Sequence, residues 1–157
     1  MSTENVSAQR TATGTTDWKA GVLGGIAGAL VMGGLMLVMN DAVLAVAIPS
    51  LYGLAPPANP GLGLFVHVSH GAVLGVAFAG LAQALSIRET NRLVGLGVAW
   101  GVVIWIGLAA LLMPVWLDVV GSPASPPLPN FAPPSLLWHV VYGLVLGLVA
   151  AVAKNQA

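Results

Sequence analysis

Two histidines stand at matching positions in two apolar stretches of the chain. The stretch VHVSHGAVLGVAFAG begins at Val66, the stretch WHVVYGLVLGLVAAV begins at Trp138, and their overlay places His67 on His139. A neutral imidazole is a common ligand of metal ions and haem iron, and it also hydrogen-bonds the polar groups of small molecules. A pair of imidazoles held by apolar segments is therefore the first chemistry that the sequence suggests.

Small residues follow each of these histidines at every fourth position. Residues four apart lie on one face of a helix, so each histidine heads a stripe of glycines. The glycines are Gly71 and Gly75 after His67, and Gly143 and Gly147 after His139. If both stripes lined one gap, the glycines would leave a flat slot that a planar macrocycle could fill. One candidate is therefore haem b, with His67 and His139 as ligands of the haem iron and electron transfer as the function.

Other assignments of the histidines remain open. His70 lies one turn beyond His67 on nearly the same face and could add a donor. A zinc or copper site would need a third ligand, such as His70, Asp41 or Asp118, and a quinone is a further candidate ligand. A histidine near a membrane interface can also be purely structural, bonded to a carbonyl or water, and glycines allow close helix packing without any ligand.

The sequence carries no recognisable catalytic constellation. It contains no GxSxG, P-loop or HExxH stretch. It also has no cysteine, which excludes disulfides, thiolate metal sites and iron–sulfur clusters. We therefore expect a protein that is not an enzyme.

The elements that must position the histidines are membrane helices. Only 6% of the 157 residues are charged and 57% are hydrophobic, whereas soluble domains average about 25% charged residues. Four apolar segments reach the length of about 20 residues that a helix needs to span a bilayer. They are 20–39, 61–85, 93–116 and 135–153. The net charge is zero and no basic run occurs, so we expect no nucleic-acid partner.

The basic residues indicate the orientation in the membrane. Arg10 and Lys19 precede the first segment, Arg88 and Arg92 lie between the second and third, and Lys154 follows the fourth. Four spans place all of them on one side, which the positive-inside rule assigns to the cytoplasm. We predict a multi-pass protein of the cytoplasmic membrane with both termini inside. Residues 1–17 are rich in Ser and Thr and are predicted to form a disordered cytoplasmic tail.

The two connections on the other side are rich in proline and contain no lysine or arginine: IPSLYGLAPPANPG and GSPASPPLPNFAPPS. The piece DAVLAVAIPSLYG before the first of them either continues the first helix or lies in the membrane interface. Aromatic residues near these connections predict a belt at the outer interface, and Trp18 fits the inner one. The residues of the outer belt are Tyr52, Trp116, Phe131 and Trp138.

The chain is predicted to be a duplication of one helical hairpin. The overlay of the histidine stretches extends backwards, with Gly24 on Gly97 and Gly28 on Gly101. The repeats cover 18–86 and 91–154, and together they form one domain over 18–157. The predicted fold class is all-α, an integral membrane four-helix bundle built from two tandem hairpins that run in the same sense.

The stretches HGAVLGVAFAGL and WHVVYGLVLGLVAAV, together with GVLGGIAGALVM, give a family resemblance. Over most of residues 21–153 the chain resembles small four-helix membrane proteins of haloarchaea. The resemblance implies a fold and no activity, so it assigns a role to no residue.

These observations lead to three expectations for the function. The first is a non-catalytic accessory subunit of a larger membrane complex, such as a respiratory one, with lipids and other integral membrane subunits as partners. It rests on the missing catalytic set, the two proline-rich connections on one side and the glycine faces that could receive other helices. The alternatives are a bis-histidine haem b electron-transfer protein and a homo-oligomer that binds lipid or pigment along its glycine grooves.

Overall fold

The computed structural model describes residues 18–154, and these residues form helices and connections with no strand among them. Four of the helical stretches are long and apolar enough to cross a membrane, which confirms the predicted all-α membrane fold. The four spans are Trp18–Met39, Pro60–Ala84, Thr90–Val119 and Pro133–Ala153. The predicted disordered tail, 1–17, lies outside the described residues.

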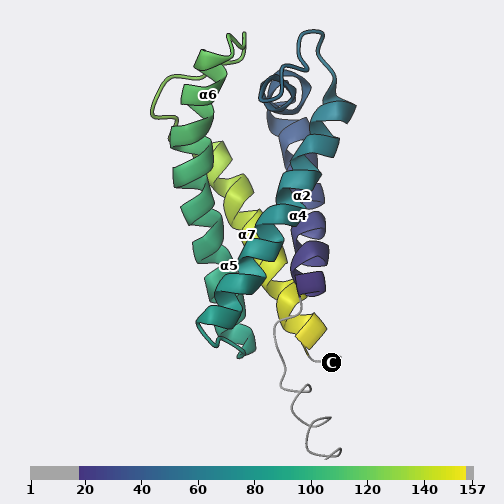
Figure 1. Ribbon diagram of the computed structural model, residues 1–157, viewed down its shortest axis with the longest axis vertical. Helices are drawn as coiled ribbons and strands as arrows, with labels where there is room; N and C mark the ends of the chain where they lie inside the picture. The colour runs from purple at the N-terminus through teal and green to yellow at the C-terminus, as the bar shows by residue number, and fades with distance from the viewer. Residues whose placement is uncertain (1–17, 155–157) are drawn as a thin grey trace, which may run out of the picture.

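The elements follow one another in two similar sets. The first set is α2 (Trp18–Met39), the short helices η1 (Val43–Ala47) and α3 (Ile48–Ser50), and α4 (Pro60–Ala84). The second set is α5 (Thr90–Ile104), η2 (Trp105–Leu112), α6 (Met113–Val119) and α7 (Pro133–Lys154). The first span ends at Met39, and η1 and α3 turn across the bundle, so that they are seen nearly end-on in Figure 1.

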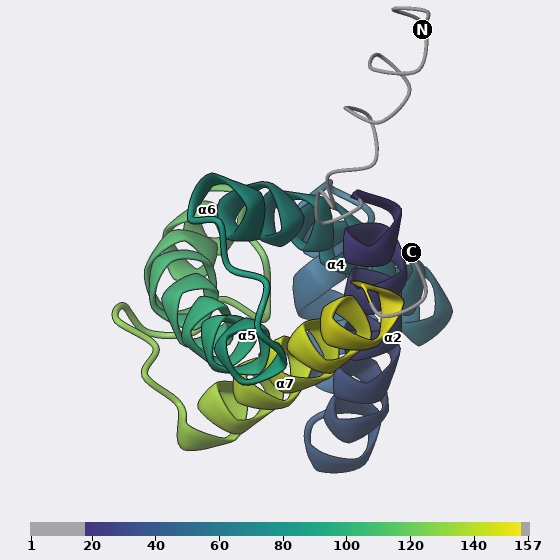
Figure 2. The same ribbon diagram turned by 90° about the horizontal axis from the view of Figure 1, so that it is seen from below.

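The four long helices form a curved row. Helix α2 packs against both α4 and α7, while α5 packs against α7. Figure 2 shows α7 lying between α5 and α2. Because α4 and α5 stand at the two ends of this row, the space between them is not filled by direct helix packing.

The two ends of the bundle differ in charge. The start of α2, the α4–α5 connection and the end of α7 lie together at the bottom of Figure 1, and we call this the basic end because it carries Lys19, Arg88 and Arg92. The opposite end carries the connections 51–59 and 120–132, and we call it the proline-rich end. The placement of these arginines and Lys19 at one end agrees with the predicted four-span arrangement.

Glycines set the spacing within each hairpin. Gly25 on α2 lies against the backbone of Gly71 on α4, and Gly97 on α5 lies against the backbone of Gly143 on α7. An added Cβ would collide with the facing backbone at each position, so only glycine permits these distances. Gly25 is therefore the structural counterpart of Gly97, whereas the sequence overlay placed Gly24 there.

Helix α2 carries a second glycine face. Gly24 contacts Leu146 and Gly28 contacts Tyr142, and both of these partners lie on α7. The spacing of Gly24 and Gly28, one turn apart, lets α2 pack closely on α7. The one-residue error in the overlay has this cause, because α2 has two overlapping glycine stripes and α5 uses one.

The connections at the proline-rich end are fixed by hydrogen bonds to the π-helical segments. The carbonyl of Ala45 in η1 accepts a hydrogen bond from the backbone N–H of Asn59 over 2.8 Å, and that of Ala110 in η2 accepts one from Asn130 over 2.9 Å. The wide turns of a π-helix interrupt the regular α-helical hydrogen bonding. Their carbonyls can therefore accept hydrogen bonds from the N–H groups of the connection that follows. Asn59 also caps α4, because its side-chain oxygen accepts a hydrogen bond from the N–H of Leu62.

Candidate functional site: a cavity at the proline-rich end

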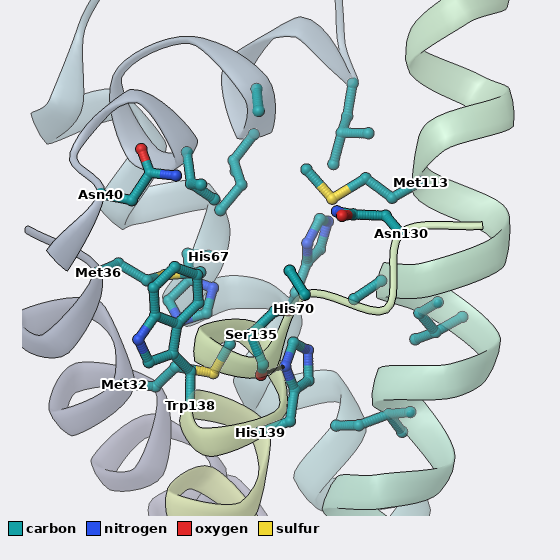
Figure 3. Close-up of a pocket in the computed structure, with 18 of the residues that line it drawn as sticks. Met32, Met36, Asn40, His67, His70, Met113, Asn130, Ser135, Trp138 and His139 are labelled. Carbon is teal, nitrogen blue, oxygen red and sulfur yellow. Dashed lines mark hydrogen bonds between the residues drawn. The ribbon is translucent and has the colours of Figure 1, made fainter. Parts of the chain in front are cut away.

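A cavity of about 1120 Å³ lies between the two ends of the helix row. Residues of α2, α4, η2, α6 and α7 line it, together with parts of both proline-rich connections. All three histidines are among the lining residues: His67, His70 and His139. The structure thus brings together the imidazoles that the sequence analysis singled out, as Figure 3 shows. Among residues 18–154, no Asp, Glu, Lys or Arg lines the cavity.

The imidazole of His139 is held by its own helix. Its Nδ1–H donates a hydrogen bond to the backbone carbonyl of Ser135 over 2.7 Å (dashed in Figure 3). A carbonyl oxygen only accepts, so Nδ1 carries the proton, and in the neutral ring Nε2 carries a lone pair. Among residues 18–154, the Nδ1 bond is the hydrogen bond that this ring makes, and Nε2 has no partner. His139 therefore presents one hydrogen-bond acceptor or metal ligand.

His67 is buried to a greater degree, at 9% exposed. Its ring lies against α2, with Cδ2 beside Gly33 and the Ala29 backbone close by. Nε2 is buried and has no hydrogen-bond partner within the described part of the chain. This nitrogen presents almost no surface to the cavity, although the residue contributes to the cavity wall.

His70 takes part in a link across the mouth of the cavity. The Tyr52 hydroxyl and the His70 Nε2 are 2.7 Å apart and share a hydrogen bond, and the two rings are in contact. The neighbouring residue, Leu51, accepts a hydrogen bond at its carbonyl from Nε1–H of Trp116 on α6 over 3.0 Å. We call Leu51 and Tyr52 the strap, because these two residues join α4 to α6 at the proline-rich end.

Two aromatic residues that the sequence analysis did not assign to the site contribute to it from α7. Tyr142 is 2% exposed, and its hydroxyl donates a hydrogen bond to the carbonyl of Gly71 over 2.8 Å. Trp138 is 4% exposed, and its Nε1–H points to the sulfur of Met39 at 3.1 Å. Trp138 therefore belongs to the core, which corrects its assignment to an outer aromatic belt. The spacing of Trp138, His139 and Tyr142 along one helix was the available signal for this cluster.

Methionines form much of the remaining wall. Met32, Met36 and Met39 lie on α2, and Met113 lies on α6 opposite them. Thioether side chains are flexible and polarisable, so they adapt to ligands of different shapes. The spacing of the three α2 methionines, within two turns of one helix, was visible in the sequence, but core packing explains such a stripe equally well.

The glycine stripes do not form the expected slot. Gly75 faces the backbone of Gly21, Gly143 faces that of Gly97, and Gly147 faces Leu93. Gly71 is the one predicted glycine that lines the cavity, and it is also packed against Ala29. The expected slot is therefore filled by neighbouring helices, because glycine removes the side chains that would keep their backbones apart.

The arrangement does not fit a bis-histidine haem. The Nε2 of His67 is covered, so an iron atom in the cavity could not reach it unless the ring moved. The described residues of the lining also include no Lys or Arg to pair with the two carboxylates of haem b. His139 alone is free to serve as an axial ligand.

The described residues contain no group of three His, Asp or Glu side chains close enough to hold a metal ion. Asp41 and Asp118 are exposed and do not line the cavity, so neither supplies the third ligand considered for zinc or copper.

Comparisons with known proteins give a family and no activity. The model of a family described as a family of unknown function, DUF6789, matches residues 15–157. Neither a curated protein nor a solved structure matches the chain.

Proposed function

Because the chain belongs to the DUF6789 family of unknown function, we propose its function from the cavity: it binds a neutral, largely apolar molecule inside the membrane. The observation that carries this proposal is a cavity of about 1120 Å³ to whose wall the described part of the chain contributes no charged residue. Ligand sites of drug-sized molecules typically have volumes of about 300–1,000 Å³ and are mostly apolar with a few polar groups. The cavity has this composition.

The absence of charge from the wall selects the kind of ligand. A charged group moved from water into an apolar site loses its hydration and must be paired to compensate. The cavity offers imidazoles, amides and hydroxyls instead, on residues such as His139, Asn130 and Tyr142. A molecule that already partitions into the bilayer meets this requirement.

The location of the cavity supports entry from the membrane. It lies between α4 and η2, which stand at opposite ends of the helix row and do not pack on each other along their length. In a bilayer this gap faces lipid. The positive-inside rule places the basic end, with Lys19, Arg88 and Arg92, in the cytoplasm, so the cavity would open in the outer leaflet of the cytoplasmic membrane.

The proposal is tested by mass spectrometry of the intact protein released from gentle detergent. We expect a bound small molecule on the wild-type chain and none after Ala109→Trp, which places a bulky side chain in the cavity wall. Ala77→Trp is the matched control, because Ala77 is exposed on α4 and lies outside the cavity. A wild-type protein without any bound molecule, purified from its own membranes, would overturn the proposal.

An accessory role in a larger membrane complex stays a prediction. Gly34, Gly80, Gly95 and Gly107 have open space where a side chain would lie, which leaves surfaces for close approach of other helices. Co-purification of integral membrane subunits from mild detergent would support this role, and it is compatible with ligand binding.

A further inference from the structure

We propose that the ligand is a hydroxylated aromatic lipid of the hydroquinone class, whose hydroxyl donates a hydrogen bond to Nε2 of His139. This inference rests on the proposed function and specifies the chemistry of the bound molecule. It concerns binding and discrimination between the reduced and oxidised forms of the ligand.

The hydrogen bond within α7 fixes the polarity of the site. Since Nδ1–H of His139 is committed to the Ser135 carbonyl at 2.7 Å, the neutral ring offers only a lone pair at Nε2. A hydroxyl of a hydroquinone donates to that lone pair. The carbonyl oxygen of the corresponding quinone cannot, because it is itself only an acceptor.

A second group near His139 has the same polarity. Tyr142 lies three residues further along α7, and its hydroxyl hydrogen is already donated to the Gly71 carbonyl at 2.8 Å. Its oxygen therefore has only lone pairs left for another partner. Tyr142, 2% exposed, therefore adds no donor for a quinone carbonyl, and the Nε2 of His139 is the acceptor that a ligand hydroxyl would meet.

The rest of the wall suits an aromatic ring on an apolar tail. Trp138 and Tyr142 supply aromatic surfaces, and Met32, Met36 and Met113 supply polarisable sulfur. A neutral ring needs no counter-charge, in agreement with the uncharged wall. The apolar tail would leave through the gap between α4 and η2 into the bilayer.

The test is a direct competition between the two redox forms of one molecule. Purified full-length chain in detergent is incubated without oxygen in an equimolar mixture of a decyl-benzoquinol and its decyl-benzoquinone. The protein is separated by size-exclusion chromatography, and the bound forms are extracted and quantified by absorbance. One hydrogen bond to this acceptor predicts a preference for the quinol of about tenfold. A decyl-benzene without hydroxyls serves as the ligand control and should bind no better than the quinone.

Two variants separate the acceptor from the rest of the cavity. His139→Asn keeps a donor near the Nδ1 position and removes the Nε2 lone pair, so the preference should fall to about one. Gln83→Asn is the control, because Gln83 is exposed near the end of α4 and lies outside the cavity, and it should keep the wild-type preference.

The outcomes distinguish this inference from the proposed function. Equal binding of quinol and quinone by the wild type, or an unchanged preference in His139→Asn, would overturn the inference. If neither form binds while mass spectrometry shows another bound lipid, the inference fails and the proposed function stands. If no molecule of any kind is found on the protein, the proposed function fails as well.

Discussion

The hydroxyl of Tyr142 on α7 donates a hydrogen bond to the carbonyl of Gly71 on α4 across 2.8 Å, and it joins the two hairpins beside the cavity. The two residues meet because Gly28 of α2, which lies between these helices, lets the Tyr142 ring approach closely. Gly71 and Tyr142, which come from different repeats, therefore form part of the wall of the candidate site.

Removing this hydrogen bond should weaken the bundle measurably. We expect Tyr142→Phe to lower the free energy of unfolding by about 1 kcal/mol, since the buried hydroxyl loses one hydrogen bond and little volume. Unfolding in detergent, followed by circular dichroism, measures the change. Tyr52→Phe is the control, because Tyr52 is 59% exposed, and its loss should be smaller. Equal stability of Tyr142→Phe and wild type would show that the interhelix bond contributes nothing.

The glycine contacts predict opposite effects of one substitution at two positions of the same helix. Gly75→Ala should destabilise the protein by about 1–3 kcal/mol, because the new Cβ meets the backbone of Gly21. Gly80→Ala should stabilise it by up to about 1 kcal/mol, because nothing lies within 4 Å and alanine is the better helix former. Thermal unfolding of both variants and of the wild type measures the two changes in stability. Similar changes at the two sites would argue against close packing at Gly75.

Haem binding can be settled by absorbance. We expect a preparation made with haem available to show no b-type band in a reduced-minus-oxidised spectrum, because His67 Nε2 is covered and the wall has no cation for the haem carboxylates. A b-type band that disappears in both His67→Ala and His139→Ala, but not in His70→Ala, would establish the bis-histidine site instead.

The strap predicts an effect on the rate at which a bound molecule exchanges. Trp116→Phe removes the N–H that donates to the Leu51 carbonyl and should release one side of the strap. We expect a bound molecule to exchange several-fold faster, with little change in the final amount bound. Exchange is followed by the loss of a preloaded ligand in an excess of empty detergent micelles.

Trp18→Phe provides the control for the strap experiment, since Trp18 is 61% exposed at the basic end and far from the cavity. Equal exchange rates for Trp116→Phe and wild type would show that the strap does not limit access.

The fold could be predicted because it depends on properties that are local in the sequence. Apolar length defines the four spans, and the structure places their limits within a few residues of those expected. The grouping of Lys19, Arg88 and Arg92 at one end follows from span count alone. Close helix packing at the glycines could also be predicted, because small residues at every fourth position commonly form helix contacts in membranes.

The site could be predicted only in part. The recurrence of His67 and His139 identified two residues of the cavity wall, but a glycine stripe reads the same whether it lines a ligand slot or a helix contact, as at Gly75 and Gly143. That distinction depends on which helix faces each glycine. The hydrogen bond of Trp138 likewise depends on Met39, a partner 99 positions away in the chain.

The packing of α2 on α7 has a consequence for how the protein is made. Gly24 and Gly28 of the first span pack against Leu146 and Tyr142 of the fourth span, which are synthesised more than 100 residues later. Domains generally fold in order from the N-terminal one during synthesis. Here one glycine face of the first hairpin has no partner until the fourth span is made. The cavity wall includes His139 on the fourth span, so the wall is incomplete until that span is made, and a chain that ends before it has no site in which to capture a ligand.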